Sequence, residues 1–107
     1  MRGQGRRSRL EQRMDILAAV QLSNREGEGA PPTHVMYRSN LCWTVCLNAV
    51  RQLEKFALIT RQIDSNGRTR FFLTPKGMEE LERYRLVSRA VMFGDYCEQN
   101  LVVTVNQ

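Results

Sequence analysis

The residues of this sequence best suited to chemistry are ones that recognise bases or phosphates. Asn48 and Arg51 lie within one helical turn of each other, and Thr44 lies one turn earlier. Asparagine can pair with adenine, arginine with guanine or phosphate, and threonine with phosphate or a thymine methyl group. Four apolar residues recur on the other side of the same stretch: Cys46, Ala49, Val50 and Leu53. The sequence therefore predicts a helix over residues 42–56 that presents Thr44, Asn48 and Arg51 outward.

A second group of cationic side chains lies around a predicted β-hairpin. A turn that contains Asn-Gly is flanked by two partly β-branched or aromatic segments, residues 58–63 and 68–73. Both residues of the Asn-Gly pair are expected to have positive φ angles. Alternation along the second segment places Phe71 and Leu73 toward the core. Arg68 and Arg70 then face outward, toward a phosphate or a narrow minor groove. The alternative is that these arginines pair with Asp64 or a neighbouring glutamate.

The amino terminus supplies a third cationic group. Residues 1–7 lack a hydrophobic period and contain two glycines, which predicts a mobile arm. Arg6 and Arg7 of this arm are expected to contact phosphate. A flexible basic arm can also enter a minor groove. The alternative is a tail that only aids solubility.

The distribution of charge favours a polyanionic partner. The chain has 107 residues and a formal net charge of +5, and 14 of its 16 basic residues are arginine. Residues 1–13 and 33–70 each sum to +4, whereas the segments between and after them are acidic. Arginine matches phosphate and the guanine edge with a planar fork of donors. Two basic regions separated by acidic ones indicate a binding face better than a uniform solubilising charge does.

Catalysis and metal binding have little support in the sequence. His34 is the single histidine and has no nucleophile arranged near it, so no enzyme activity is predicted. Cys42, Cys46 and Cys97 contain no Cys-x-x-Cys pair, and neither a metal nor another cofactor is predicted. No apolar run approaches the roughly 20 residues of a membrane-spanning helix. We expect a cytoplasmic protein with reduced thiols and no membrane partner.

The remaining elements follow from capping and turn signals. Ser8 and Glu11 form a capping box for a first helix that ends near residue 22 or 23. Its apolar positions are Leu10, Met14, Leu17, Ala18 and Leu22. A short second helix spans residues 31–40 and buries Val35, Met36 and Tyr37. Thr74 caps a last helix that starts at Pro75 and extends past Arg89.

The last helix carries more apolar surface than its own core needs. A seam with a period near 3.5 is formed by four residues: Leu81, Tyr84, Val87 and Val91. A second copy of the chain would bury this seam, so a homodimer is predicted. The alternative is that residues 101–105 fold back and cover it.

Together these elements predict an α+β winged helix-turn-helix, with a three-helix core, a β-hairpin wing and a long C-terminal helix. We divide the chain into a basic arm (residues 1–7), the winged helix-turn-helix domain with its dimerisation helix (8–92) and a tail (93–107). Two helices joined by a tight turn and followed by a hairpin are typical of this fold.

Three stretches carry a resemblance to a known family. Residues 34–43, Leu58-Ile59 and residues 71–77, which read Phe-Phe-Leu-Thr-Pro-Lys-Gly, resemble archaeal winged-helix DNA-binding proteins, both the small chromatin-associated branch and related one-domain transcriptional regulators. The resemblance covers about residues 8–90. It implies duplex DNA binding through the third helix and the wing, and an antiparallel dimer through the last helix. Cys42 departs from the pattern, because family members usually have a hydroxyl cap there.

The combined prediction is a regulator of transcription that binds double-stranded DNA. The expected DNA contacts are Arg6, Arg7, Arg38, Ser39, Trp43, Thr44, Asn48, Arg51, Arg68 and Arg70. A nucleoid or chromatin packaging protein is the first alternative. We expect the chain to be associated with the nucleoid in the cytoplasm. A protein-interaction module is the second, because Val45 and Leu47 place apolar side chains on the third helix.

Overall fold

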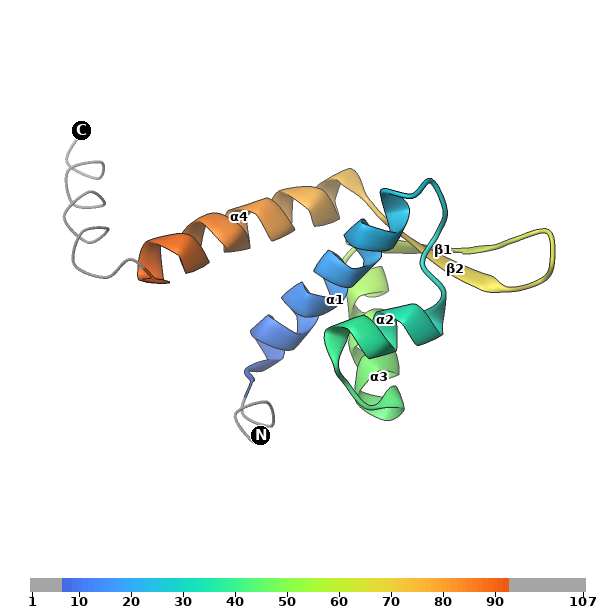
Figure 1. Ribbon diagram of the computed structural model, residues 1–107, viewed down its shortest axis with the longest axis horizontal. Coiled ribbons are helices and arrows are strands. Elements are labelled where there is room, and N and C mark those ends of the chain that lie inside the picture. Colours follow the sequence, from blue (N-terminus) through green and yellow to red (C-terminus); the bar gives the residue numbers. More distant parts are fainter. Residues whose placement is uncertain (1–6, 93–107) are drawn as a thin grey trace.

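The computed structural model describes residues 7–92 of the chain, with side chains through residue 90. Its elements follow one another as α1 (Arg9–Asn24), α2 (Pro32–Ser39), α3 (Trp43–Lys55), β1 (Ile59–Ile63), β2 (Thr69–Leu73) and α4 (Pro75–Met92). The first three helices pack together, the two strands project from them as a wing, and α4 leaves on the opposite side (Figure 1). The predicted α+β winged helix fold is confirmed. Most of the predicted arm, and the whole predicted tail, lie outside the described residues.

The helix α1 begins at the predicted capping box. The Ser8 hydroxyl accepts a hydrogen bond from the Glu11 backbone N–H at 3.0 Å, and the Glu11 carboxylate accepts one from the Ser8 N–H at 2.8 Å. The predicted apolar face of α1 is partly wrong, since Leu10 and Leu22 are 54% and 47% exposed. Ile16 and Val20 are fully buried in their place. The helices α2, α3 and α4 and the strand β2 all pack against α1, so its buried face includes Ile16 and Val20 beside the predicted Met14 and Leu17.

The helices α2 and α3 are joined by a tight turn. Asn40 ends α2 in the left-handed conformation, with φ 57° and ψ 47°, as asparagine tolerates. Tyr37 is 74% exposed, which corrects its predicted place in the core. The predicted buried stripe of α3 is confirmed in full: Cys46, Ala49, Val50 and Leu53. Cys42 precedes α3 without a side-chain capping bond.

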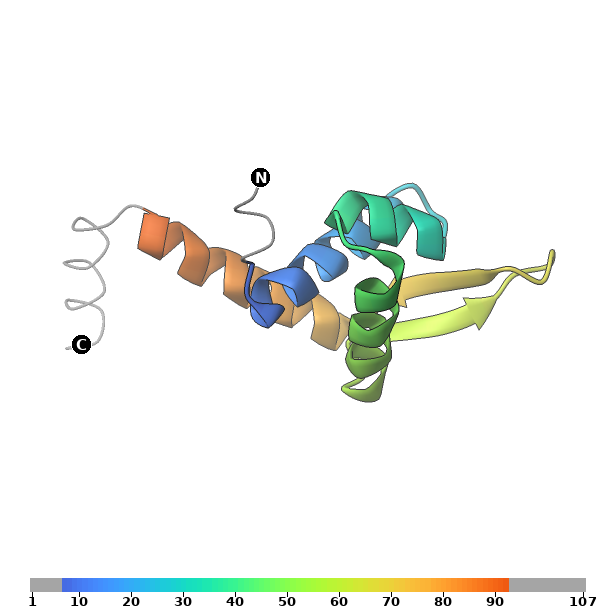
Figure 2. The same ribbon diagram turned by 90° about the horizontal axis from the view of Figure 1, so that it is seen from below.

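The wing is an antiparallel hairpin in which Ile59 pairs with Leu73 and Ile63 with Thr69. Its tip differs from the prediction, because Gly67 alone has a positive φ, of 77°, and Asn66 does not. The Gly67 N–H donates to the Asp64 carbonyl at 3.0 Å. This bond closes a β-turn over residues 64–67, and the glycine with positive φ is its last residue. Phe71 faces the core as predicted and is 2% exposed. The hairpin extends well beyond the helices (Figure 2).

The helix α4 starts where the sequence predicts. The Thr74 hydroxyl accepts a hydrogen bond from the Gly77 N–H at 2.9 Å, and Pro75 occupies the first helical position. Leu81 lies in the hydrophobic core with 2% exposure. Among the residues that the structure describes, no helix is both long and apolar enough to cross a membrane.

Candidate nucleic-acid interface

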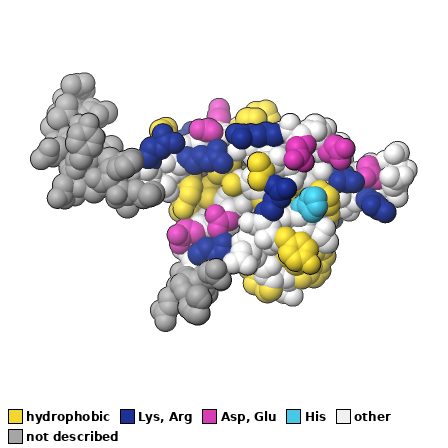
Figure 3. Space-filling model, in the orientation of Figure 1, with side chains coloured by type: hydrophobic (Ala, Val, Ile, Leu, Met, Phe, Trp, Pro, Cys, Tyr) yellow, Lys and Arg dark blue, Asp and Glu magenta, His cyan; other side chains and the backbone are white. Residues whose placement is uncertain are grey.

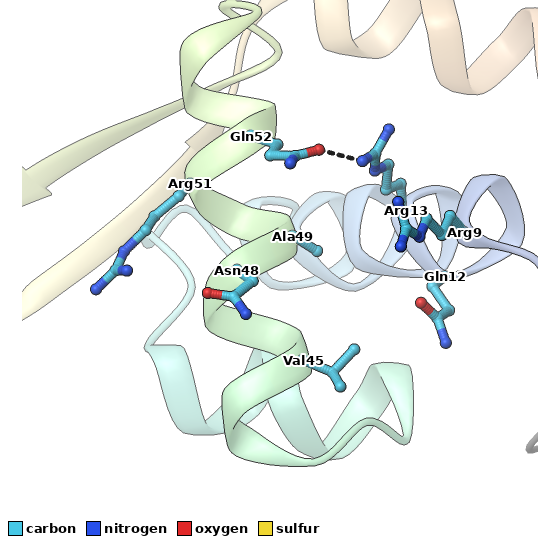
Figure 4. Close-up of a pocket in the computed structure, with 8 residues that line it drawn as sticks. All are labelled: Arg9, Gln12, Arg13, Val45, Asn48, Ala49, Arg51 and Gln52. Carbon is cyan, nitrogen blue, oxygen red and sulfur yellow. Dashed lines mark hydrogen bonds between the residues drawn. The ribbon is translucent and has the colours of Figure 1, made fainter.

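The outward face of α3 presents the side chains that the sequence predicts. Thr44, Asn48 and Arg51 are exposed. Figure 4 shows Asn48 pointing away from the core and Arg51 pointing away from α1, on the side where the strands of the wing leave. Val45 and Gln52 point toward α1 instead. The side chains of Asn48 and Arg51 are therefore free to meet a partner that contacts this face.

The two wing arginines that were predicted to contact DNA differ in their surroundings. Arg68 is exposed. Arg70 donates from Nε to the Asp64 carboxylate at 3.0 Å and from its guanidinium to the Gly29 carbonyl at 3.3 Å. Arg70 is thus held in the internal pairing that the sequence left as the alternative. Arg68 is the wing arginine that remains open to a phosphate.

Asp64 organises the tip of the wing. Its Oδ1 accepts hydrogen bonds from the backbone N–H groups of Asn66 and Arg68 at 2.8 and 2.9 Å. The bond from Arg68 N–H and then the one from the Arg70 side chain hold the pKa of the Asp64 carboxyl below its usual value. The carboxylate is therefore charged at neutral pH, and it neutralises Arg70.

The helix-turn-helix corner contains three predicted contacts with different outcomes. Arg38 and Trp43 are exposed, Trp43 at 45%. Ser39 is 1% exposed and its hydroxyl donates to the Val35 carbonyl at 2.5 Å. The prediction that Ser39 contacts DNA is therefore corrected, because its side chain is hydrogen-bonded to the backbone of α2 and is buried.

Arg7 is part of the fold, which corrects its assignment to a mobile arm. Its guanidinium donates to the carbonyls of Ser39 and Asn40, each at 2.8 Å, and pairs with the Asp15 carboxylate. Its side chain is 19% exposed. These bonds join the start of α1 to the α2–α3 turn, so Arg7 is not available as a DNA contact. Arg6 lies outside the described residues.

The predicted dimer seam on α4 is divided between core and surface. Leu81 belongs to the core and Tyr84 packs partly against it, which corrects the expectation that Leu81 faces a partner. Val87 is 59% exposed, and the side chain of Val91 lies outside the described ones. Leu86, which the seam did not include, is 64% exposed. Leu86 and Val87 are thus the large apolar side chains that are exposed on the outer half of α4, as far as its side chains are described.

Ion pairing distinguishes several arginines of the fold from the predicted DNA contacts. Five carboxylate pairs neutralise Arg7, Arg61, Arg70, Arg83 and Arg85. The predicted contacts Arg38, Arg51 and Arg68 form no ion pair with a described residue. Arg9 also forms none. Arg9 and Arg13 are four residues apart on α1, and this helical spacing was the signal that places them on one face.

The described residues contain no cluster of metal-ligating side chains. Within residues 7–92, no three histidine, cysteine, aspartate or glutamate side chains are grouped as metal ligands would be. Burial raises the pKa of the Cys46 thiol, so this cysteine is a protonated core residue at neutral pH.

The family follows from comparison with known proteins. The profile of the winged helix-turn-helix family matches residues 6–91. The chain belongs to this winged helix-turn-helix family. No match was found among curated proteins.

Solved structures share the fold of this winged helix-turn-helix chain at low sequence identity. MepR, a transcription regulator of the Staphylococcus aureus multidrug efflux pump MepA, has 22% identity and a TM-score of 0.63, over 87% of this chain and 63% of that one. The S. aureus MepR–DNA complex has 18% identity and a TM-score of 0.64, over 89% and 77%. A MarR-family transcriptional regulator from Silicibacter pomeroyi has 22% identity and a TM-score of 0.59, over 90% and 67%. The chain spans less than two thirds of the length of the first of these proteins.

Proposed function

We propose that this winged helix-turn-helix chain binds double-stranded DNA and regulates transcription. The observation that carries the proposal is the outward face of α3, where Asn48 and Arg51 are exposed and Arg51 has no carboxylate partner among residues 7–90. Five other arginines of the fold are each paired with an acid. A free guanidinium and a free amide on one helix face are the groups that read base edges in the major groove.

The proposed mode of binding uses two elements. The helix α3 enters the major groove, where Asn48 pairs with adenine and Arg51 with guanine or an adjacent phosphate. Arg68 on the wing and Arg38 before the α2–α3 turn contact the sugar–phosphate backbone. The fold similarity to the S. aureus MepR–DNA complex supports this proposal. No catalytic step is part of it.

Duplex affinity should depend steeply on salt and on Arg51. We expect the affinity for a fluorescent duplex to fall as salt rises from about 50 to about 200 mM, with a slope of about −0.9 per phosphate contact. Arg51→Ala should weaken binding about tenfold at constant salt. Fluorescence anisotropy measures both quantities. Arg83→Ala is the charge-matched control, because Arg83 lies on α4 in a pair with Glu80. An Arg51→Ala protein that binds as tightly as the control would remove α3 from the mechanism.

Regulation and packaging make different predictions for sequence preference. We propose a regulator, because Asn48 and Arg51 can distinguish bases. We also propose that the chain is related to the archaeal chromatin-associated proteins and one-domain regulators that it resembles. We propose a location at the nucleoid, in the cytoplasm. A footprint on genomic DNA separates the two roles: discrete protected sites support a regulator, and uniform coating supports packaging.

We further propose that two copies pair through the outer half of α4. The support is that Leu86 and Val87 are 64% and 59% exposed on a helix that leaves the core (Figure 1). Analytical ultracentrifugation should find a dimer for the unmodified chain and a monomer for the double variant Leu86→Glu, Val87→Glu. Met78→Glu, nearer the core end of α4, is a control for added charge. An unmodified chain that stays monomeric over a wide range of concentration would contradict the proposal.

One observation favours a protein partner as a second function. Apolar side chains are exposed over α2 (Figure 3), where Tyr37 is 74% exposed, and Trp43 and Val45 at the start of α3 are 45% and 37% exposed. Such a patch is typical of protein contacts. If no duplex binds at about 50 mM salt, where electrostatic binding is strong, this second function is favoured.

A further inference from the structure

A groove of about 550 Å³ runs between α1 and α3, on the side of α3 away from the wing. Its α1 wall is formed by Arg9, Gln12 and Arg13, and its α3 wall includes Asn48, Arg51 and Gln52. Figure 4 shows Gln52 reaching from α3 toward Arg13, which donates a hydrogen bond to the Gln52 side-chain oxygen. This bond links the two walls across the groove.

The groove is cationic and contains no acid. The side chains of Arg9 and Arg13 line it from α1, whereas the Arg51 guanidinium points away from α1 (Figure 4), and no aspartate or glutamate among the described residues lines it. The two acids in the first half of α1 are engaged elsewhere: Glu11 accepts from the Ser8 N–H, and Asp15 pairs with Arg7. Arg9 is exposed and forms no ion pair with any residue in the range 7–90. Positive charge that its own fold leaves uncompensated, beside amide donors, suits a phosphate group.

The position of the groove relative to α3 decides which phosphate it suits. A helix in the major groove, which is about 12 Å wide, has one sugar–phosphate backbone on each side. The wing lies on one side of α3 and α1 on the other (Figures 2 and 4). Arg68 of the wing faces the first backbone in the mode proposed above. A second cationic wall is required on the α1 side if both backbones are held.

The geometry points to α1 as that second wall: Arg9 and Arg13 bind phosphates of the DNA strand opposite the one that the wing contacts. This inference rests on the proposed DNA binding and extends its surface to a helix outside the helix-turn-helix pair. It also assigns Arg9 a role, since its side chain has no structural bond within the described residues that would explain it.

The test combines salt titration with ethylation interference on the full chain. Arg9→Ala should weaken duplex binding about three- to fivefold at about 100 mM salt, and Arg9→Ala with Arg13→Ala about tenfold or more. The salt slope should become shallower by about 0.9 for each phosphate that is no longer bound. Within each half-site, ethylation interference should disappear at phosphates of one strand in the double variant, and at phosphates of the other strand in Arg68→Ala.

Controls separate this inference from unfolding and from failure of the proposed function. Arg9→Ala removes no hydrogen bond between described residues, so its melting temperature should match that of the unmodified chain, whereas Arg13→Ala removes the bond to Gln52. Arg83→Ala removes the same charge from α4 and should leave the salt slope unchanged. If the unmodified chain does not bind duplex, the proposed function fails. If Arg51→Ala weakens binding but Arg9→Ala keeps the original affinity, slope and interference pattern, the α1 wall alone is overturned.

Discussion

Replacing Gly77 with alanine is expected to lower the free energy of unfolding by about 3 kcal/mol. A Cβ at this buried position lies 2.2 Å from the Leu58 carbonyl oxygen and 2.9 Å from the Leu73 side chain. The first of these neighbours is backbone, so the start of α4 has to move away from β1. The same change at an open helical site usually stabilises by up to about 1 kcal/mol. A loss of stability in Gly77→Ala, in place of a gain, therefore tests the close approach of Gly77 to the Leu58 carbonyl.

The measurement is urea unfolding followed by circular dichroism. Met78→Ala is the matched control, because it changes the next residue of α4, which is 47% exposed, and should alter stability by no more than about 0.5 kcal/mol. A Gly77→Ala protein that is as stable as the unmodified chain, or more so, would show that the start of α4 does not approach the Leu58 carbonyl as closely as described.

Arg7→Ala should lower the free energy of unfolding by about 2–3 kcal/mol. Hydrogen bonds to charged groups contribute roughly 1.5–3 kcal/mol each, but some carbonyls near Arg7 can bind water once it is removed. The change leaves the carbonyls of Ser39 and Asn40 at the end of α2 without their donor, and it also leaves Asp15 without its partner. Backbone amides at the α2–α3 turn should exchange faster with solvent.

Arg7→Lys separates charge from geometry. Lysine can still attract Asp15, but its single ammonium cannot replace the planar fork that reaches both carbonyls, so an intermediate decrease in stability is expected. Exposed Arg9→Ala, two residues along the chain, should leave stability unchanged. Equal stability of the Arg7→Ala and unmodified proteins would restore the interpretation of residue 7 as part of a mobile arm.

Neither Gly77 nor Arg7 contacts DNA in the proposed mode of binding, but each helps to position elements of the fold. Gly77 sets where α4 meets the base of the wing, because its nearest neighbours are Leu58 before β1 and Leu73 at the end of β2. Arg7 fixes the turn that orients α3 against α2. Both variants should therefore weaken duplex binding only to the extent that they unfold the chain, whereas Arg51→Ala weakens it in a folded protein.

Much of the fold was predictable because its signals are local. The Ser8–Glu11 capping box, the left-handed Asn40, the Gly67 turn and the Thr74–Pro75 helix start each depend on hydrogen bonds between residues that are neighbours in the chain. The buried stripe of α3 was predictable for the same reason, since a helical period is a property of the sequence alone. The outward direction of Asn48 and Arg51 follows from that stripe.

The tertiary structure decided which of these side chains are free. Arg68 and Arg70 have the same sequence pattern, but only Arg70 lies against Asp64 and the Gly29 carbonyl. Arg7 meets carbonyls that are 32 and 33 residues away, and Arg13 meets Gln52 from 39 residues away. An ion pair depends on the distance between groups after the helices have packed, and periodicity contains no such distance. For this reason the sequence by itself determined the elements and the face of α3, and the packing determined the charge that remains for a partner.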